Sequence, residues 1–171
     1  MRTIFGGFLL ASAATIFSGC EVEQPPAPQV STHVEKVKAN RTVQGDLQFV
    51  RGFQNGYDAA VTTSKPMLIF FTAEWCEFCY QMGRDAFTNP ATVRLSDQFI
   101  CILVDRDKEL EVCKQYGVQS FPTIQFLSPR GVLLNRLEGK NSGQQVIMAM
   151  QQALQSVARR AEQQAGEAIL R

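Results

Sequence analysis

The sequence contains very little histidine and no strong excess of charge of either sign. Of its 171 residues only one, His33, is a histidine, and the formal net charge is +1. A near-zero net charge gives no sign of binding to nucleic acid. Internal repeats are absent, which excludes a solenoid. Hydrophobic residues make up 45% of the chain, enough for the core of one globular domain.

Long hydrophobic runs are also missing, and the most apolar stretch lies at the N-terminus. It begins after Arg2, extends from Ile4 to Phe17, and ends in Ser-Gly before Cys20. This run is short for a membrane span and has the layout of a secretory signal. The cysteine after Ser-Gly resembles the lipobox of bacterial lipoproteins, in which the cysteine is diacylated, although Phe17 stands where leucine is usual. An ordinary cleaved signal and an uncleaved anchor are the alternatives.

The first 44 residues therefore predict export followed by a tether. We interpret residues 1–19 as a lipoprotein-type signal peptide and Cys20 as the lipidated mature N-terminus. The protein would then be an exported bacterial lipoprotein on the periplasmic or outer-surface side of a membrane, where disulfides can persist. Residues 20–44, with three prolines between 25 and 28, are expected to be a flexible tether. Residues 45–171 would form a monomeric domain with a polar C-terminal tail.

Within that domain, apolar runs and helical patterns alternate. We expect strands at 46–50, 67–71, 99–105, 123–127 and 132–137, and helices at 52–65, 76–85, 89–96, 107–117 and 142–163. The continuous apolar runs at 67–71 and 99–105 are typical of strands buried on both faces. The order predicts an α/β fold, with a mixed central sheet and helices on both of its faces.

Two cysteines, Cys76 and Cys79, stand three positions apart where the strand at 67–71 gives way to a helix. Residues at this spacing lie on one side of a helix, with Cα atoms roughly 5 Å apart, within reach of a disulfide. At the helix N-terminus, free N–H groups and the helix dipole favour a thiolate. We therefore expect Cys76 to be the exposed attacking thiol and Cys79 the resolving thiol in thiol–disulfide exchange.

A structural zinc site and a purely structural disulfide are the alternatives for this pair. Structural zinc needs four ligands, typically as two closely spaced pairs. Cys101 and Cys113 are twelve residues apart in sequence, and each lies among apolar neighbours in a predicted regular element. We therefore predict no metal site and no cofactor. Cys101 and Cys113 are interpreted as small buried hydrophobes, with a second disulfide or a regulatory thiol as alternatives.

The segments "AEWCEFC" (73–79) and "YGVQSFPT" (116–123) together resemble the two signatures of the thioredoxin superfamily. The resemblance extends over about 47–154 and is especially similar to secreted thioredoxin-like proteins and to the C-terminal domain of disulfide-bond protein D. It implies a thioredoxin fold, with a cis peptide bond before Pro122 that faces the disulfide. It also implies that the Phe121 backbone binds the partner peptide and that Trp75 is a flat lid beside Cys76. An ordinary trans proline and plain packing of Trp75 are the alternatives.

The sequence departs from the family pattern in two places. Phe70 stands where a buried aspartate is usual, so Glu74 or water would have to accept the proton of Cys79. The dipeptide between the cysteines is Glu-Phe and contains no histidine. Glu74 and Glu77 flank Cys76 and oppose the helix dipole. We therefore expect a moderately stabilised thiolate and a reducing or electron-transferring role rather than that of a strong oxidant.

The sequence as a whole predicts an exported, membrane-tethered thiol–disulfide oxidoreductase. Its partners would be protein thiols and disulfides, a further redox protein and, through the lipid on Cys20, a membrane, but not nucleic acid. The alternative is a thioredoxin-fold binding module, either a chaperone or a metallochaperone that holds copper or zinc between Cys76 and Cys79.

Overall fold

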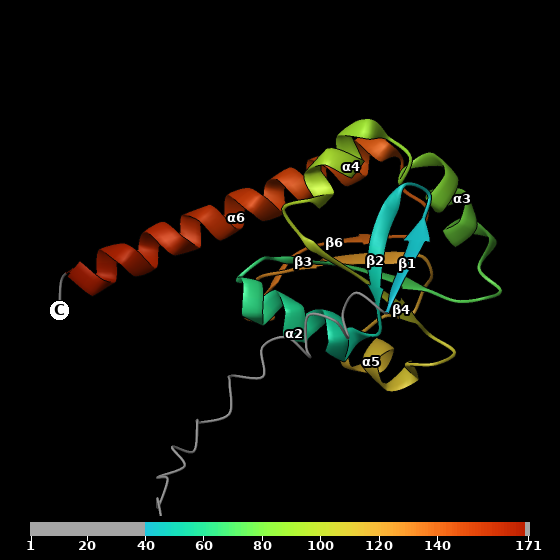
Figure 1. The fold of residues 1–171 in the computed structure, drawn as a ribbon, viewed down its shortest axis with the longest axis horizontal. Helices are drawn as coiled ribbons and strands as arrows, with labels where there is room; N and C mark the ends of the chain where they lie inside the picture. The colour runs from blue at the N-terminus through green and yellow to red at the C-terminus, as the bar shows by residue number, and fades with distance from the viewer. Residues whose placement is uncertain (1–39, 170–171) are drawn as a thin grey trace, which may run out of the picture.

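The computed structural model describes residues 40–169, which form one mixed sheet between two layers of helices (Figure 1). The predicted signal peptide and Cys20 lie outside the described residues. The strands are β1 (Arg41–Gln44), β2 (Leu47–Arg51), β3 (Met67–Thr72), β4 (Ile100–Asp105), β5 (Thr123–Leu127) and β6 (Leu133–Glu138). The helices are α2 (Phe53–Thr63), α3 (Glu77–Asp85), α4 (Pro90–Ser96), α5 (Leu110–Gln115) and α6 (Gly143–Ile169).

The strands follow one another across the sheet in the order β1-β2-β4-β3-β5-β6. β4 pairs in parallel with β2 and β3, because helices connect these strands by crossovers. β5 is antiparallel to β3, and β6 closes the sheet as the hairpin partner of β5. The predicted mixed sheet is confirmed. β3 and β4 are its two central strands, and their carboxyl ends meet at one edge.

The edge strand β1 was not predicted, since the tether was expected to continue to Gln44. β1 and β2 form an antiparallel hairpin through the two-residue turn Gly45-Asp46, with Gly45 at φ 59°. A glycine with positive φ at the first turn position is what a tight hairpin favours. The Arg41 guanidinium donates to Gln48 Oε1 at 3.0 Å across the strands. The folded domain therefore begins at least one strand earlier than the sequence suggested.

The sheet is buried on both faces because β3 has apolar side chains at every position from 67 to 71. Leu68 and Phe70 pack in one core beneath α3 and α6, with partners from β2, β4 and β5. Met67, Ile69 and Phe71 pack on the opposite face, against residues of α2 and α5. Figure 1 shows the two helical layers on either side of the sheet. This double burial holds the carboxyl end of β3 rigidly, and the C-x-x-C segment follows it directly.

The last helix, α6, begins with a capping box at Ser142 and is longer than expected. The Ser142 hydroxyl accepts from Gln145 N–H at 3.3 Å, and Gln145 Oε1 accepts from Ser142 N–H at 2.8 Å, which is a capping box. The helix continues to Ile169 instead of ending near 163. Its last turns are rich in alanine, arginine, glutamate and glutamine, which favour helix even without packing. In the described part of the chain, no helix has both the length and the apolarity needed to cross a bilayer.

Candidate redox site

The two motif cysteines form a disulfide at the point where β3 passes into α3. Cys76 is the N-cap of α3, and its Sγ accepts a hydrogen bond from Cys79 N–H at 3.2 Å. A short turn after β3 sets this geometry, with Cys76 N–H donating to the Ala73 carbonyl at 3.1 Å. The Cα atoms are 5.3 Å apart, as the spacing predicted. The helix N-terminus therefore directs an N–H donor at the sulfur of Cys76.

The expectation that Cys76 is exposed is wrong for the disulfide form. Cys76 is 4% exposed and Cys79 is 3% exposed. Both residues pack in the core that contains Phe70. The exposed aromatic side chains of this segment are Trp75, Phe78 and Tyr80, at 64%, 57% and 48%. A partner protein would thus meet aromatic side chains around a recessed sulfur pair.

The loop before β5 lies beside the disulfide segment, as the resemblance implied. The Phe121–Pro122 peptide bond is cis, which confirms the prediction. The rings of Trp75 and Phe121 are 6.0 Å apart and nearly perpendicular. Trp75 also carries the Arg106 guanidinium 6.0 Å from its ring centroid. Trp75 is thus held by an aromatic and a cationic neighbour at the surface and is not part of the core.

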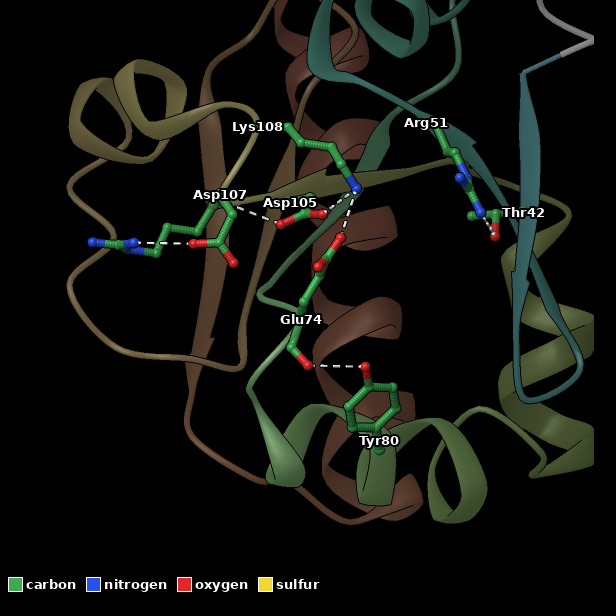
Figure 2. A network of polar contacts seen from close by, with 8 residues as sticks. Thr42, Arg51, Glu74, Tyr80, Asp105, Asp107 and Lys108 are labelled. Atoms are coloured by element: carbon green, nitrogen blue, oxygen red, sulfur yellow. Dashed lines mark hydrogen bonds and ion pairs between the residues drawn. The ribbon is translucent and has the colours of Figure 1, made fainter.

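The acids beside Cys76 are less isolated than the sequence implied. Lys108 Nζ lies 3.0 Å from Glu74 Oε1 and 2.9 Å from Asp105 Oδ2, so one lysine joins two carboxylates (Figure 2). Glu77 pairs with Arg84 at 3.6 Å. Hydrogen bonds from Lys108, first to Asp105 and then to Glu74, raise the pKa of its ammonium above the ordinary value. The expected crowding of Cys76 by two acids is therefore reduced by ion pairing.

A pocket of about 520 Å³, lined mostly by polar residues, includes Cys79 in its lining. Phe70 is fully buried, with its ring 4.9 Å from that of Phe87, so an apolar ring fills the position of the usual aspartate. The pocket lining includes Glu74, Asp105, Lys108, Tyr80 and Glu109, together with residues of β1 and the start of α2. The proton-accepting role expected for Glu74 stays a prediction.

Sequence reasoning did not single out Asp105 or Lys108. The register of the parallel strands pairs Thr72 with Asp105, so the ends of β3 and β4 lie side by side. The carboxyl ends of adjacent parallel strands are where polar functional groups of open sheets gather. An aspartate at the end of the second buried strand was therefore a usable signal in the sequence.

The remaining described cysteines, Cys101 and Cys113, are free and buried. Cys101 lies in the core beneath α3 and α6, whereas Cys113 lies in the core on the other face of the sheet. The sheet separates them, which explains why they are not paired. Burial, with a smaller contribution from Asp97, raises the pKa of the Cys101 thiol to about 12. Burial likewise raises the pKa of the Cys113 thiol. Over residues 40–169 no cluster of three or more His, Cys, Asp or Glu side chains is placed to hold a metal ion.

A central strand that delivers a C-x-x-C disulfide to a helix N-terminus, with a cis-proline loop beside it, defines a thioredoxin-like redox protein. The family model described as Thioredoxin matches residues 49–152, more than half of the chain. The chain therefore belongs to the thioredoxin family.

Individual relatives match over parts of the chain. Thioredoxin-like protein slr0233 of Synechocystis is 30% identical over 99 residues, covering 58% of this chain and 91% of that protein. The chloroplastic thioredoxin-like protein HCF164 of Arabidopsis thaliana is 28% identical over 75 residues, 44% of this chain, but the match spans only 29% of HCF164.

Solved structures show the same fold at low identity. A thioredoxin from Thermus thermophilus superposes with a TM-score of 0.58 at 22% identity, covering 63% of this chain and 87% of that one. A DsbH oxidoreductase superposes with a TM-score of 0.53 at 22% identity, covering 61% and 82%.

Proposed function

We propose that this protein is a thiol–disulfide oxidoreductase that reduces, or passes electrons to, disulfides of other proteins. The observation that carries the proposal is the Cys76–Cys79 disulfide at the N-cap of α3, beside the Phe121–Pro122 loop. In the reduced form, the Cys76 thiolate attacks a partner disulfide and forms a mixed disulfide. Cys79 then attacks Cys76 Sγ and releases the partner as a reduced thiol. Trp75, Phe121 and Pro122 would bind the partner segment.

The charges around Cys76 support the reducing direction. A strong oxidant needs a strongly stabilised reduced thiolate. Here the N–H of Cys79 donates to Cys76 Sγ. The nearby cationic side chains, however, are paired with acids: Lys108 with Glu74, and Arg84 with Glu77. We therefore expect a reduction potential nearer the thioredoxin value of about −270 mV than the strong-oxidase value of about −120 mV. Titration of the cysteine pair against glutathione measures it, and a midpoint near the oxidase value would exclude a reductase.

Turnover with a protein disulfide tests the activity itself. With dithiothreitol as electron donor, the chain should accelerate the reduction of insulin, and Cys76→Ser should abolish the acceleration. Cys79→Ser should instead accumulate a mixed disulfide with the substrate, because the resolving thiol is missing. Cys101→Ala is the matched control, since Cys101 is buried in the core. Equal turnover by the wild-type and Cys76→Ser chains would contradict the proposal.

We further propose that the protein is exported and held at a membrane by lipid on Cys20. The support is the sequence alone: an apolar run that ends in Ser-Gly-Cys. Two acyl chains should hold the protein firmly, since each buried methylene contributes about 0.8 kcal/mol. Mass spectrometry of the membrane-extracted protein should show a diacylated N-terminal Cys20. An unmodified Cys20 thiol in that fraction would end this part of the proposal.

A further inference from the structure

We propose that Asp105, positioned by Lys108, is the proton acceptor that activates Cys79 through water in the polar pocket. The inference rests on the proposed function, because Cys79 has to attack only if a mixed disulfide forms on Cys76. The attacking species in that step is a thiolate, not a thiol. A thiol buried as deeply as Cys79 ionises less readily than an exposed one, so a nearby base would accelerate the step.

The aromatic core does not supply this base, because the side chain at position 70 is a fully buried phenylalanine. Its ring packs against Phe49 and Phe87. The pocket has both Cys79 and carboxylate side chains in its lining. A polar cavity of about 520 Å³ is large enough to hold several waters, and water can relay a proton between groups that do not touch.

Among the three carboxylates of the pocket, Asp105 is the best placed. Glu109 Oε1 already accepts the N–H of Phe53 at 2.8 Å, at the start of α2. The side chain of Glu74 is 70% exposed, and that of Asp105 only 13%. Asp105 is also held at both oxygens, by Lys108 at Oδ2 and by the N–H of Asp107 at Oδ1, 3.0 Å away. Figure 2 shows Lys108 between the two acids.

The proton of Cys79 Sγ passes through water to the Asp105 carboxylate, and the thiolate attacks Cys76 Sγ. The Cys76–Cys79 bond forms as the bond between Cys76 and the partner sulfur breaks. The partner leaves as a thiolate and takes up a proton, from Asp105 through the same water or from solvent. The partner disulfide has then gained two electrons, and the C-x-x-C dithiol has lost them.

A small aromatic disulfide separates attack from resolution. The reduced full chain, carrying Cys20→Ser, is mixed with one equivalent of 5,5′-dithiobis(2-nitrobenzoate). Attack by Cys76 releases the first thiolate, and attack by Cys79 releases the second, so stopped-flow absorbance shows two phases. Asp105→Asn should slow only the second phase, by at least about tenfold near neutral pH. The deficit should shrink as the pH rises, because hydroxide then removes the proton without help.

Glu111→Gln is the matched control, because it removes the same charge six residues away, and Glu111 is exposed and is not part of the pocket lining. It should leave both phases unchanged, and Asp105→Glu should restore most of the second phase. Near-ultraviolet circular dichroism checks that each variant is folded. Equal slowing of both phases, a second phase unaffected by Asp105→Asn, no rescue by Asp105→Glu, or a larger effect of Glu74→Gln would each overturn the proposal. Insulin turnover by the wild-type chain tests the proposed function separately.

Discussion

The indole of Trp75 stands edge-on to the ring of Phe121, with the centroids 6.0 Å apart and the planes at 84°. This contact joins the segment that carries the disulfide to the loop that carries the cis-proline. Both residues are part of the surface around the sulfur pair, and Trp75 is mostly exposed. The contact therefore bears more on how a partner is received than on the stability of the core.

Trp75→Ala should weaken the binding of protein disulfide substrates while leaving the fold intact. An aromatic contact between Trp75 and the partner would contribute about 0.5–1.5 kcal/mol to binding, so its loss should raise KM for insulin about two- to tenfold. The rate with a small disulfide should change much less, because it needs no extended surface. Steady-state kinetics with both substrates measure the difference. Leu133→Ala, which shortens an exposed apolar side chain on β6, is the control. Equal losses with both substrates would refute a role in partner binding.

Replacing Phe70 with aspartate, the usual residue of the family at this position, should destabilise the chain. Phe70 is fully buried between Phe49 and Phe87, so Phe70→Ala should lower the free energy of unfolding by about 3–5 kcal/mol. Phe70→Asp should lower it further, since the aromatic pocket leaves a buried carboxyl group without a partner. Urea unfolding measures both, with Phe78→Ala expected within about 0.5 kcal/mol of wild type because Phe78 is exposed. A Phe70→Asp chain as stable as wild type would contradict this prediction and would show that water reaches the aromatic site around position 70.

Lys108→Met should reduce stability at neutral pH but not in strong alkali. The pKa of Lys108 is raised above its ordinary value of 10.5 by Asp105 and Glu74. The stabilisation is therefore fully present below about pH 10.5 and is lost as the pH rises through the folded-state pKa. Because Lys108 is exposed, the effect should be small. Urea unfolding of both chains between neutral and alkaline pH should show the gap closing, and a gap that widens with pH would contradict the assignment.

Cys101 should resist alkylation in the folded protein. Its thiol ordinarily has a pKa of 9.0, and burial raises this to about 12. The folded state therefore favours the neutral thiol, and its stability should fall from about pH 9 towards pH 12 as the unfolded chain ionises first. Cys101→Ala should lack this part of the slope. Iodoacetamide labelling followed by mass spectrometry at pH 9 should modify Cys101 only after urea is added, and rapid labelling of the native protein would refute its burial.

The central part of the fold could be predicted because its signals are local. Continuous apolar runs marked β3 and β4 as doubly buried strands, and the order of elements required parallel pairing between them. The C-x-x-C spacing and the segment around Pro122 supplied the candidate site and its cis bond. The helix expected at 89–96 is α4, and its N-cap is Asn89, whose side chain accepts from Ala91 N–H.

The features that could not be predicted depend on contacts between distant segments. β1 has only four residues and no apolar alternation, so only its pairing with β2 identifies it. The burial of Cys76 results from packing around Phe70 and could not follow from its position at a helix N-terminus. Lys108 lies 34 residues from Glu74 in sequence and meets it only because β3 and β4 end together.

The long α6 helix projects from the domain and makes the molecule elongated. Leu154 still packs against the core, and the helix continues from there to Ile169. At 1.5 Å per residue, that stretch is roughly 20 Å long, and Figure 1 shows the end of α6 projecting away from the other elements. A body of this shape rotates faster about its long axis than across it. The amide N–H bonds of α6 lie along the helix axis, so their nitrogen relaxation should differ from that of the strands even where both are equally rigid.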